Sequence, residues 1–385
     1  MKYRVDGKSG KELSVLGLGC MRFPRDKNET ERMVLSAIEN GVNYFDTAYL
    51  YPNSEETLGK ILAKHNKRKD VYIATKLPMM SCNSKEDFDK LFDRQLKRMQ
   101  TDYIDYYMIH NIPALAQWSR IKDLGIEEWV ETKKKSGQIK QIGFSFHGTY
   151  DEFIKVLDDY SWEFCMIQYN YYDVNYQAGQ KGLKAAYERG IPVMIMEPLL
   201  GGRLATGLPK QAISAFAKVN PTRKPVDWAL WWLWNQKEVT VILSGMNSLE
   251  QMESNINSAN DFKALTNEEM AIYNEVTDIF KRSYKIPCTS CDYCMPCPKG
   301  VNISACFSAY NASYTQGYVT GMTLYLTSTA ALAKTSLSVR KCTNCGLCEK
   351  QCPQNIPIAK SLKKVARRFE PLPVRLILSL VKRVL

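Results

Sequence analysis

The sequence contains no run of about 18 uninterrupted apolar residues, the length that a helix needs to cross a bilayer. Its first ten residues are charged and lack the apolar core of a secretory signal. Acidic side chains are scarce in one region only. Residues 281–385 contain 3 Asp and Glu against 16 Lys and Arg, whereas residues 1–280 contain 37 against 36. We therefore expect a cytoplasmic protein whose net charge of +12 lies in its C-terminal part.

Cysteine is also nearly absent from most of the chain, because nine of the 12 cysteines lie in the last 98 residues at short, regular spacings. Disulfides belong to oxidising compartments, so this pattern indicates metal binding. Cys20, Cys82 and Cys165 stand alone and are expected to be packing residues. The length of 385 residues, with 45% apolar and 24% charged content, suits one large folded domain and a smaller one.

Short runs rich in β-forming residues alternate with amphipathic stretches between residues 14 and 259. Eight such runs cover residues 14–19, 44–48, 71–77, 103–110, 141–146, 164–170, 192–198 and 239–245. Eight βα units predict an α/β protein with a closed (β/α)₈ TIM barrel, which we assign to residues 1–284. Residues 1–13 are expected to form a turn-rich strand pair that plugs the bottom of the barrel.

Polar side chains capable of acid–base chemistry follow three successive predicted strands. Asp46, Lys76 and His110 end these strands, and Tyr51 lies five residues after Asp46. Because the carboxyl ends of barrel strands surround one mouth, we expect the four side chains to meet there. Any one of them alone is more often a packing or ion-pair residue, but the four together favour a catalytic site.

The segments GVNYFDTAYLYPNSE, IATK and YMIH resemble the aldo-keto reductase family, which carries an Asp, a Tyr, a Lys and a His at these strand ends. The resemblance implies an oxidoreductase that transfers hydride between NAD or NADP and a small carbonyl or alcohol substrate. In this interpretation Tyr51 is the general acid. Lys76, held by Asp46, makes its phenol a better proton donor, and His110 orients the substrate oxygen.

The same resemblance implies contacts with the cofactor. Ser145 and Gln168 match the residues that hold the carboxamide, and the last strand and helix match the adenosine phosphate region, with Gly245, Asn247, Gln251 and Asn255 as contacts. Three positions depart from the family pattern, namely Phe146, Glu197 and Ser254. No Lys or Arg lies in residues 244–255, so a 2′-phosphate would lack its usual cationic partner and the choice between NADH and NADPH stays open.

Two runs of four cysteines lie near the C-terminus. The first is Cys288, Cys291, Cys294 and Cys297, and the second is Cys342, Cys345, Cys348 and Cys352, each followed by proline. The second has the C-x₂-C-x₂-C-x₃-C-P spacing of bacterial two-cluster ferredoxins, in which the fourth cysteine binds the other cluster. We therefore predict two [4Fe-4S] clusters, one held by Cys288, Cys291, Cys294 and Cys352 and the other by Cys342, Cys345, Cys348 and Cys297.

The first cysteine run is one residue shorter than the usual pattern, which leaves Cys306 as an alternative ligand to Cys297. Zinc is the competing metal, although two runs that each end in Cys-Pro exceed what a zinc site needs. Residues 285–385 are thus expected to form a small, mostly helical ferredoxin-like domain. An inserted helical segment separates the two runs.

A basic tail follows Pro357, with eight basic residues and one acidic residue. Helical spacing places Leu362, Val365, Ala366 and Phe369 on one face. Three interpretations stay open: contact with an anionic membrane surface, docking of an acidic redox partner, and packing of the apolar face on the barrel. No groove-reading motif accompanies the charge, so we expect no nucleic acid partner.

Nicotinamide transfers two electrons as hydride, whereas an iron–sulfur cluster transfers one. Direct exchange would need a splitter such as a flavin, which the barrel mouth could hold, although the sequence contains neither a flavin motif nor a Rossmann fingerprint. The leading hypothesis is a reductase whose clusters relay electrons to or from a redox partner. The alternatives are a carbonyl reductase with structural clusters, a flavin-using electron-transfer protein and a non-catalytic scaffold.

Overall fold

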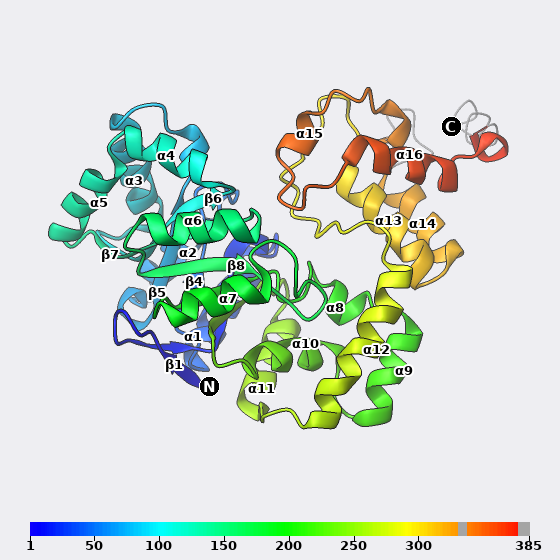
Figure 1. Cartoon of the computed structure of the whole chain (residues 1–385), viewed down its shortest axis with the longest axis horizontal. Coiled ribbons are helices and arrows are strands. Elements are labelled where there is room, and N and C mark those ends of the chain that lie inside the picture. The colour runs from blue at the N-terminus through cyan, green and yellow to red at the C-terminus, as the bar shows by residue number, and fades with distance from the viewer. Residues whose placement is uncertain (330–336, 376–385) are drawn as a thin grey trace. The chain divides into compact units, whose positions relative to one another are not determined.

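The computed structural model describes residues 1–329 and 337–375 (Figure 1). The chain packs into two compact units, each built from two segments. The first comprises Met1–Pro198 and Asp227–Leu265, and the second comprises Leu199–Val226 and Thr266–Leu385. These units are defined by which residues pack together, so each contains two separate segments of the chain. The domain boundary expected at residue 284 divides the chain at a single point, and it stays a prediction.

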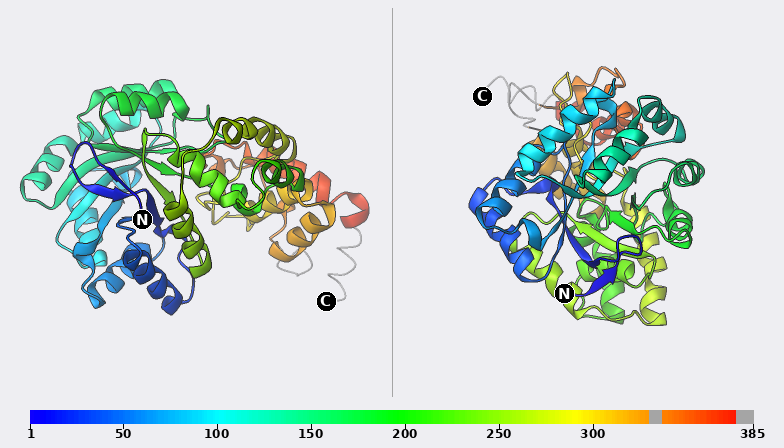
Figure 2. Two further views of the ribbon diagram at one scale, coloured as in Figure 1. Left: turned by 90° about the horizontal axis from the view of Figure 1, so that it is seen from below. Right: turned by 90° about the vertical axis from the view of Figure 1, so that its left-hand side faces the viewer.

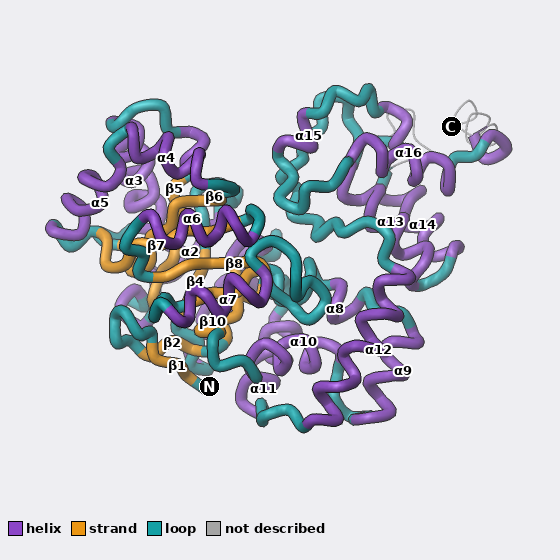
Figure 3. The backbone as a smooth tube through the Cα atoms, in the orientation of Figure 1, coloured by secondary structure: helices purple, strands orange, loops and turns teal. Residues whose placement is uncertain are grey.

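The first unit contains a closed barrel of eight parallel strands in the order β10-β3-β4-β5-β6-β7-β8-β9 (Figure 3). The strands are β3 (Leu16–Gly19), β4 (Tyr44–Asp46), β5 (Tyr72–Leu77), β6 (Ile104–Ile112), β7 (Ile139–Phe146), β8 (Phe164–Gln168), β9 (Val193–Met196) and β10 (Val239–Ser244). Each of the eight predicted runs contains or overlaps one of them. The predicted fold class is therefore confirmed.

The barrel interior is filled by large apolar side chains that alternate along the strands. Tyr106 and Met108 on β6, and Phe164 and Met166 on β8, belong to one buried cluster. Side chains two residues apart share a face of a strand, so each pair projects inward while its neighbours face the helices. The Tyr106 ring lies 5.1 Å from Phe164 and 5.2 Å from Tyr44, measured between ring centroids. The interior is thus a packed core.

The first residues close the bottom of the barrel, as predicted. Strands β1 (Tyr3–Val5) and β2 (Glu12–Ser14) pair antiparallel, and Leu13 belongs to the interior cluster. The hydroxyl of Tyr106, near the start of β6, donates to Asp6 Oδ2 at 2.7 Å. Functional groups are therefore left to the opposite end, where the strands finish.

Helices surround this barrel (Figure 2). They are α1 (Lys27–Glu39), α2 (Ser54–Lys64), α3 (Glu86–Met99), α4 (Leu115–Asp123), α5 (Ile126–Lys135), α6 (Tyr150–Asp159), α7 (Gly179–Glu188), α10 (Pro225–Trp234) and α11 (Leu249–Asp261). Ser248 is the N-cap of helix α11, because its side chain accepts a hydrogen bond from the Gln251 N–H. Ser54, the first residue of α2, instead donates its hydroxyl to the Cys20 carbonyl at 2.7 Å.

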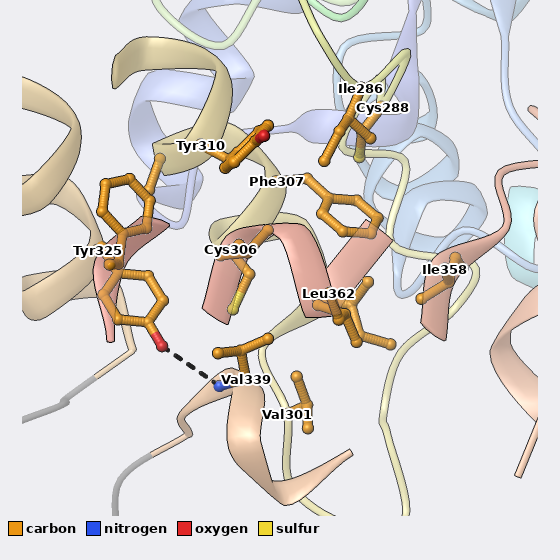
Figure 4. Packing of buried hydrophobic residues seen from close by; sticks show 14 of the residues in the cluster. Ile286, Cys288, Val301, Cys306, Phe307, Tyr310, Tyr325, Val339, Ile358 and Leu362 are labelled. Carbon is orange, nitrogen blue, oxygen red and sulfur yellow. Dashed lines mark hydrogen bonds between the residues drawn. The ribbon is translucent and has the colours of Figure 1, made fainter. Parts of the chain in front are cut away.

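The second unit is mostly helical. It contains α8 (Arg203–Thr206), α9 (Lys210–Val219), α12 (Asn267–Ser283), α13 (Ile303–Thr315), α14 (Tyr318–Ser328), η4 (Val339–Lys341), α15 (Leu347–Lys350) and α16 (Ile358–Phe369). Helices α13 and α14 form the helical segment predicted between the cysteine runs. Phe307, Tyr325, Val339 and Leu362 meet in a shared apolar core (Figure 4). Cys306 lies in this core and is fully buried.

Helix α16 buries its predicted apolar face inside this same core. Leu362, Val365 and Phe369 are buried there, while Lys363 and Arg367 are exposed. The apolar face is therefore covered by the second unit itself. Contact of the tail with a membrane surface stays a prediction, and it would depend on exposed basic side chains and on residues 376–385, which lie outside the described residues.

One backbone contact joins the two segments of the second unit. Gly201 has φ +63°, and a Cβ atom at this position would lie 2.2 Å from the carbonyl oxygen of Thr289, in the first cysteine run. Arg203 Nη2 also donates to Ser290 Oγ at 3.0 Å. Only glycine allows the two backbones to approach this closely, so the segment that follows β9 is fastened to the first cysteine loop.

We expect Gly201→Ala to destabilise the second unit more than Gly202→Ala does. Both residues have positive φ, and alanine there costs about 1–2 kcal/mol. Gly202 has open space around it, whereas Gly201→Ala adds a steric clash of about 1–3 kcal/mol. Chemical denaturation of the full-length variants measures the difference, and equal destabilisation by the two substitutions would show that the close approach is absent.

Candidate functional site

A buried ion pair lies at the mouth of the barrel. Lys76 Nζ donates to Asp46 Oδ1 at 2.7 Å, to Asp46 Oδ2 at 2.8 Å and to the Thr47 carbonyl at 2.6 Å. Asp46 ends β4, Lys76 lies on the paired strand β5, and the two residues are 4% and 1% exposed. Burial raises the pKa of the Asp46 carboxyl, and the Lys76 ammonium opposes that rise. These acceptors hold the ammonium group in one position.

Tyr51 and His110 lie beside this pair. Lys76 Nζ is 5.0 Å from the centroid of the Tyr51 ring. The rings of Tyr51 and His110 have centroids 6.2 Å apart and planes at 88°. The structure therefore brings together all four of the residues predicted to be catalytic, each from the carboxyl end of a strand or the loop after it.

His110 is 6% exposed, and burial lowers its pKa well below 6.5. The positive charge of Lys76 and the neighbouring His147 lower this pKa further. Burial also lowers the pKa of His147, to about 4. His110 is consequently neutral near pH 7, so its imidazole can donate or accept a hydrogen bond but adds no positive charge to the site.

A second buried carboxylate, not predicted from the sequence, connects the strand of Lys76 to the loop of Tyr51. Glu55 is 1% exposed. Its Oε1 accepts from Thr75 Oγ1 and Gln95 Nε2, both at 2.7 Å, and its Oε2 accepts from Arg98 Nη1 at 3.0 Å. Arg98 Nη1 also donates to the carbonyl of Tyr49, at 3.3 Å. The network thus fixes two of the segments that carry the predicted catalytic residues.

Glu55 and Glu56 both lie in the first turn of α2. An acidic residue at the start of a helix is usually exposed, as Glu56 is here. The available signal was helical periodicity, because Glu55 precedes Leu58 and Leu62 by three and seven residues and so shares their buried face. A charged residue on the apolar face of a helix indicates a buried partner.

Two predicted cofactor contacts lie at the ends of adjacent strands. Ser145 on β7 and Gln168 on β8 are 2% and 1% exposed. Ser145 Oγ accepts the Asn111 N–H at 2.8 Å, which leaves its hydroxyl hydrogen to donate. Gln168 Nε2 donates to Asp173 Oδ2 at 2.9 Å. A hydroxyl and an amide near the ends of adjacent strands have the hydrogen-bonding chemistry that a nicotinamide carboxamide needs.

The other predicted contacts surround the start of α11. Gln251 Oε1 accepts the Asn247 N–H at 3.1 Å, and Asn255 Nδ2 donates to Ser244 Oγ at 2.9 Å. Asn255 is 3% exposed and faces β10, so its amide supports the strand. A Cβ at Gly245 would meet only Gly19 O, at 4.0 Å, and the backbone there is accessible at a helix N-terminus, as a phosphate group requires.

One hollow in the second unit is lined by thiols from both cysteine runs. Cys288, Cys291 and Cys294 of the first run and Cys352 of the second border it, with Ile303, Phe307, Ile356 and Ile358 as apolar walls. Burial and the thiols of Cys288, Cys291 and Cys352 raise the pKa of Cys294 to about 12. Four thiols facing an apolar hollow fit an iron–sulfur cluster, and they are the set predicted for the first cluster.

A second group of thiols forms around Cys348. Burial raises the pKa of Cys348, and Cys342 and Cys297 lie close enough to raise it further. Cys297 of the first run is therefore beside the second run, and Cys345 is exposed. The alternative ligand Cys306 instead lies in the hydrophobic core (Figure 4). In residues 1–329 and 337–375, no three His, Cys, Asp or Glu side chains converge tightly enough to hold a single metal ion.

Among residues 1–329 and 337–375, no helix has both the length and the apolar content that crossing a bilayer needs.

Comparison with known proteins gives relatives of the barrel. The uncharacterized oxidoreductase YqkF of Bacillus subtilis (strain 168) is 29% identical over 319 residues, which are 73% of this chain and 99% of that protein. L-galactose dehydrogenase of Arabidopsis thaliana is 27% identical, covering 69% and 90% of the two chains. The solved structure of aldo-keto reductase AKR11C1 from Bacillus halodurans (holo form) is 27% identical, covers 72% of this chain and 96% of its own, and superimposes with a TM-score of 0.61.

Two family models match the chain. The 4Fe-4S dicluster domain matches residues 287–357, which contain both cysteine runs, and such a domain holds two clusters. The aldo/keto reductase family matches residues 15–278, which contain the whole barrel and the four clustered residues at its mouth. These matches confirm the predicted resemblance: the chain belongs to the aldo/keto reductase family of oxidoreductases and carries a 4Fe-4S dicluster domain after its barrel.

Proposed function

We propose that the barrel transfers hydride between a nicotinamide cofactor and a small carbonyl or alcohol substrate, with Tyr51 as the proton donor and acceptor. The observation that carries this proposal is the position of the buried Lys76–Asp46 pair, whose ammonium lies 5.0 Å from the Tyr51 ring. A cation at this distance stabilises a phenolate, so it favours proton transfer from the phenol. One relative of the barrel is a dehydrogenase of L-galactose.

Each residue has a distinct part in the proposed reaction. The nicotinamide supplies or accepts the hydride. In the reductive direction Tyr51 donates a proton to the carbonyl oxygen, and in the oxidative direction it accepts that proton back. Neutral His110 hydrogen-bonds the same oxygen and orients the substrate. Both NADH and NADPH stay within the proposal, because residues 244–255 contain no cation for a 2′-phosphate.

Replacing the proposed proton donor should abolish turnover. We expect Tyr51→Phe to lower kcat by about 10²–10⁴, the usual contribution of a general acid, while NAD(P)H binding is retained. Tyr49→Phe is the matched control, because it removes a hydroxyl from the same loop and loses only a bond to Arg94 at the surface. Anaerobic oxidation of NAD(P)H with a panel of aldehydes measures turnover, and an active Tyr51→Phe variant would rule out Tyr51 as the donor.

Glu55 should affect the same reaction only by holding the Tyr51 loop and β5 in position. Glu55→Gln keeps the size of the side chain but removes the charge that faces Arg98, so the Tyr51 loop and β5 lose a common anchor. We expect kcat to fall about tenfold, with KM for the substrate changing by less than about twofold. Glu56→Gln is the control, since Glu56 is exposed and pairs with Lys60 at the surface. A shift confined to the melting temperature would mean that Glu55 serves stability only.

We further propose that the two clusters relay single electrons between the barrel and a redox partner. The two thiol groups differ in exposure, with Cys288 buried in the first and Cys345 exposed in the second, as an inner and an outer carrier would be. Two clusters accept two electrons in total, which matches one hydride in number. Because nicotinamide releases both electrons together, the relay also requires a bound carrier that takes up two electrons and passes them on singly, such as a flavin. The competing function is an ordinary carbonyl reductase with structural clusters. The further alternative, a flavin-using electron-transfer protein, has no support from either matched family, so a flavin enters here only as the carrier that the relay requires.

A cluster-ligand variant separates these two functions. If the clusters relay electrons, Cys345→Ser should lower NAD(P)H-dependent reduction of benzyl viologen at least about tenfold, or about 1.4 kcal/mol in activation free energy. Cys306→Ala, in the core of the same unit, should retain both iron and activity. Iron and sulfide analysis and the visible spectrum give the cluster content of each variant. Unchanged dye reduction and aldehyde turnover in folded Cys345→Ser protein would make the clusters structural.

A further inference from the structure

We infer that a small acidic electron-carrier protein docks over the second thiol group, on a basic face formed by Lys341, Lys350, Lys360, Lys363 and Arg367. The inference rests on the relay proposed above and specifies its partner and the surface that binds it. All five side chains of this basic face are exposed.

The basic face borders the second thiol group. Lys341 directly precedes Cys342, and Lys350 ends α15, the short helix that contains Cys348. Lys363 shares a hollow with Cys342. Lys360 and Arg367 lie three and four residues from Lys363 on α16, so they extend the same side of that helix. The charges therefore lie around the ligands of one cluster.

The second thiol group is also the one that a partner can approach. Cys345 is exposed, and the neighbouring Leu347 has 52% of its surface accessible. The first group lies against apolar walls, with Cys288 buried. Because an electron crosses between proteins only where a redox centre is near the surface, the second group is the point of exchange. Leu347 supplies the small apolar centre that a transient interface has inside its polar rim.

Nearby acidic side chains are turned inward and leave the positive charge uncompensated. Glu349 Oε1 accepts the Ala359 N–H at 2.9 Å, at the start of α16. Glu370 is 4% exposed, accepts the Ser338 hydroxyl at 2.6 Å and pairs with Arg340 at 3.1 Å. Among the described residues, no ion pair includes a member of the basic face. The surface is therefore complementary to an acidic protein, which it would attract by long-range steering.

A redox protein fits this surface better than a membrane does. A helix that lies on a bilayer inserts its apolar face, but the apolar face of α16 is buried in the core of the second unit. Lys341 and Lys363 lie beside the thiol of Cys342, and Lys350 lies on the helix of Cys348, an arrangement that serves electron exchange and has no role in lipid binding. An anionic lipid surface is therefore the competing occupant to be tested.

The experiment uses the full-length chain with its clusters loaded anaerobically, and an acidic bacterial-type two-cluster ferredoxin as the probe. Calorimetric titration at low and high ionic strength measures affinity. We expect Lys341→Glu/Lys363→Glu to weaken binding about tenfold, and added salt to weaken wild-type binding more than that of the variant. The control Lys69→Glu/Lys184→Glu makes the same change of net charge at exposed positions of the first unit and should alter affinity less than about twofold.

Three results would overturn the inference. The first is that ferredoxin does not bind at low ionic strength. The second is that the two double variants lose ferredoxin affinity equally. The third is that the protein binds phosphatidylserine–phosphatidylcholine vesicles but not ferredoxin, and that Lys341→Glu/Lys363→Glu abolishes the vesicle binding. Unchanged visible spectra show that the variants retain their clusters. The relay is tested separately by Cys345→Ser. Dye reduction without ferredoxin binding would reject only the basic face, and ferredoxin binding with unchanged dye reduction in Cys345→Ser would reject only the relay.

Discussion

The buried pair of Lys76 and Asp46 is the interaction on which the active end of the barrel depends. Transferring two charges out of water costs several kcal/mol for each ion. The attraction between the ions offsets this cost only when their geometry is good and their hydrogen bonds are satisfied. Here both carboxylate oxygens and the Thr47 carbonyl accept from the ammonium, at 2.6–2.8 Å. The resulting cation is held beside the Tyr51 ring. Burial lowers the pKa of the nearby His110, and the Lys76 charge lowers it further. The neutral histidine at this mouth therefore depends on burial and on the ion pair together.

A strand exposes successive side chains on opposite faces, and β5 uses both. Lys76 points into the barrel mouth and binds Asp46, whereas Thr75 points outward and binds Glu55. Gln95 ties the two faces together, because its Nε2 donates to Glu55 and to the Lys76 carbonyl. Two buried carboxylates thus fix one strand. Asp46 binds the Lys76 side chain, and Glu55 binds the Thr75 side chain and, through Gln95, is linked to the Lys76 carbonyl.

The second unit holds many thiols close together in a small volume. Its apolar core orients the helices between and after the two cysteine runs, so that a thiol from each run crosses to the other group. Gly201 and Arg203 fasten the first cysteine loop to the segment that leaves β9. The first thiol group lies against apolar walls, while Cys345 of the second group and the basic face are exposed to solvent.

The barrel, the four residues at its mouth and the grouping of the cysteines could be predicted, because each follows from a local signal: strand periodicity, position at a strand end, or ligand spacing. The apolar face of α16 could also be predicted, although what covers it could not. The burial of Glu55 at the centre of a network, the place of Cys306 in a core and the contact of Gly201 with Thr289 are visible only in the folded chain. These facts depend on contacts between residues far apart in the chain, and no local pattern of side chains encodes which distant backbone or carboxylate will be brought alongside.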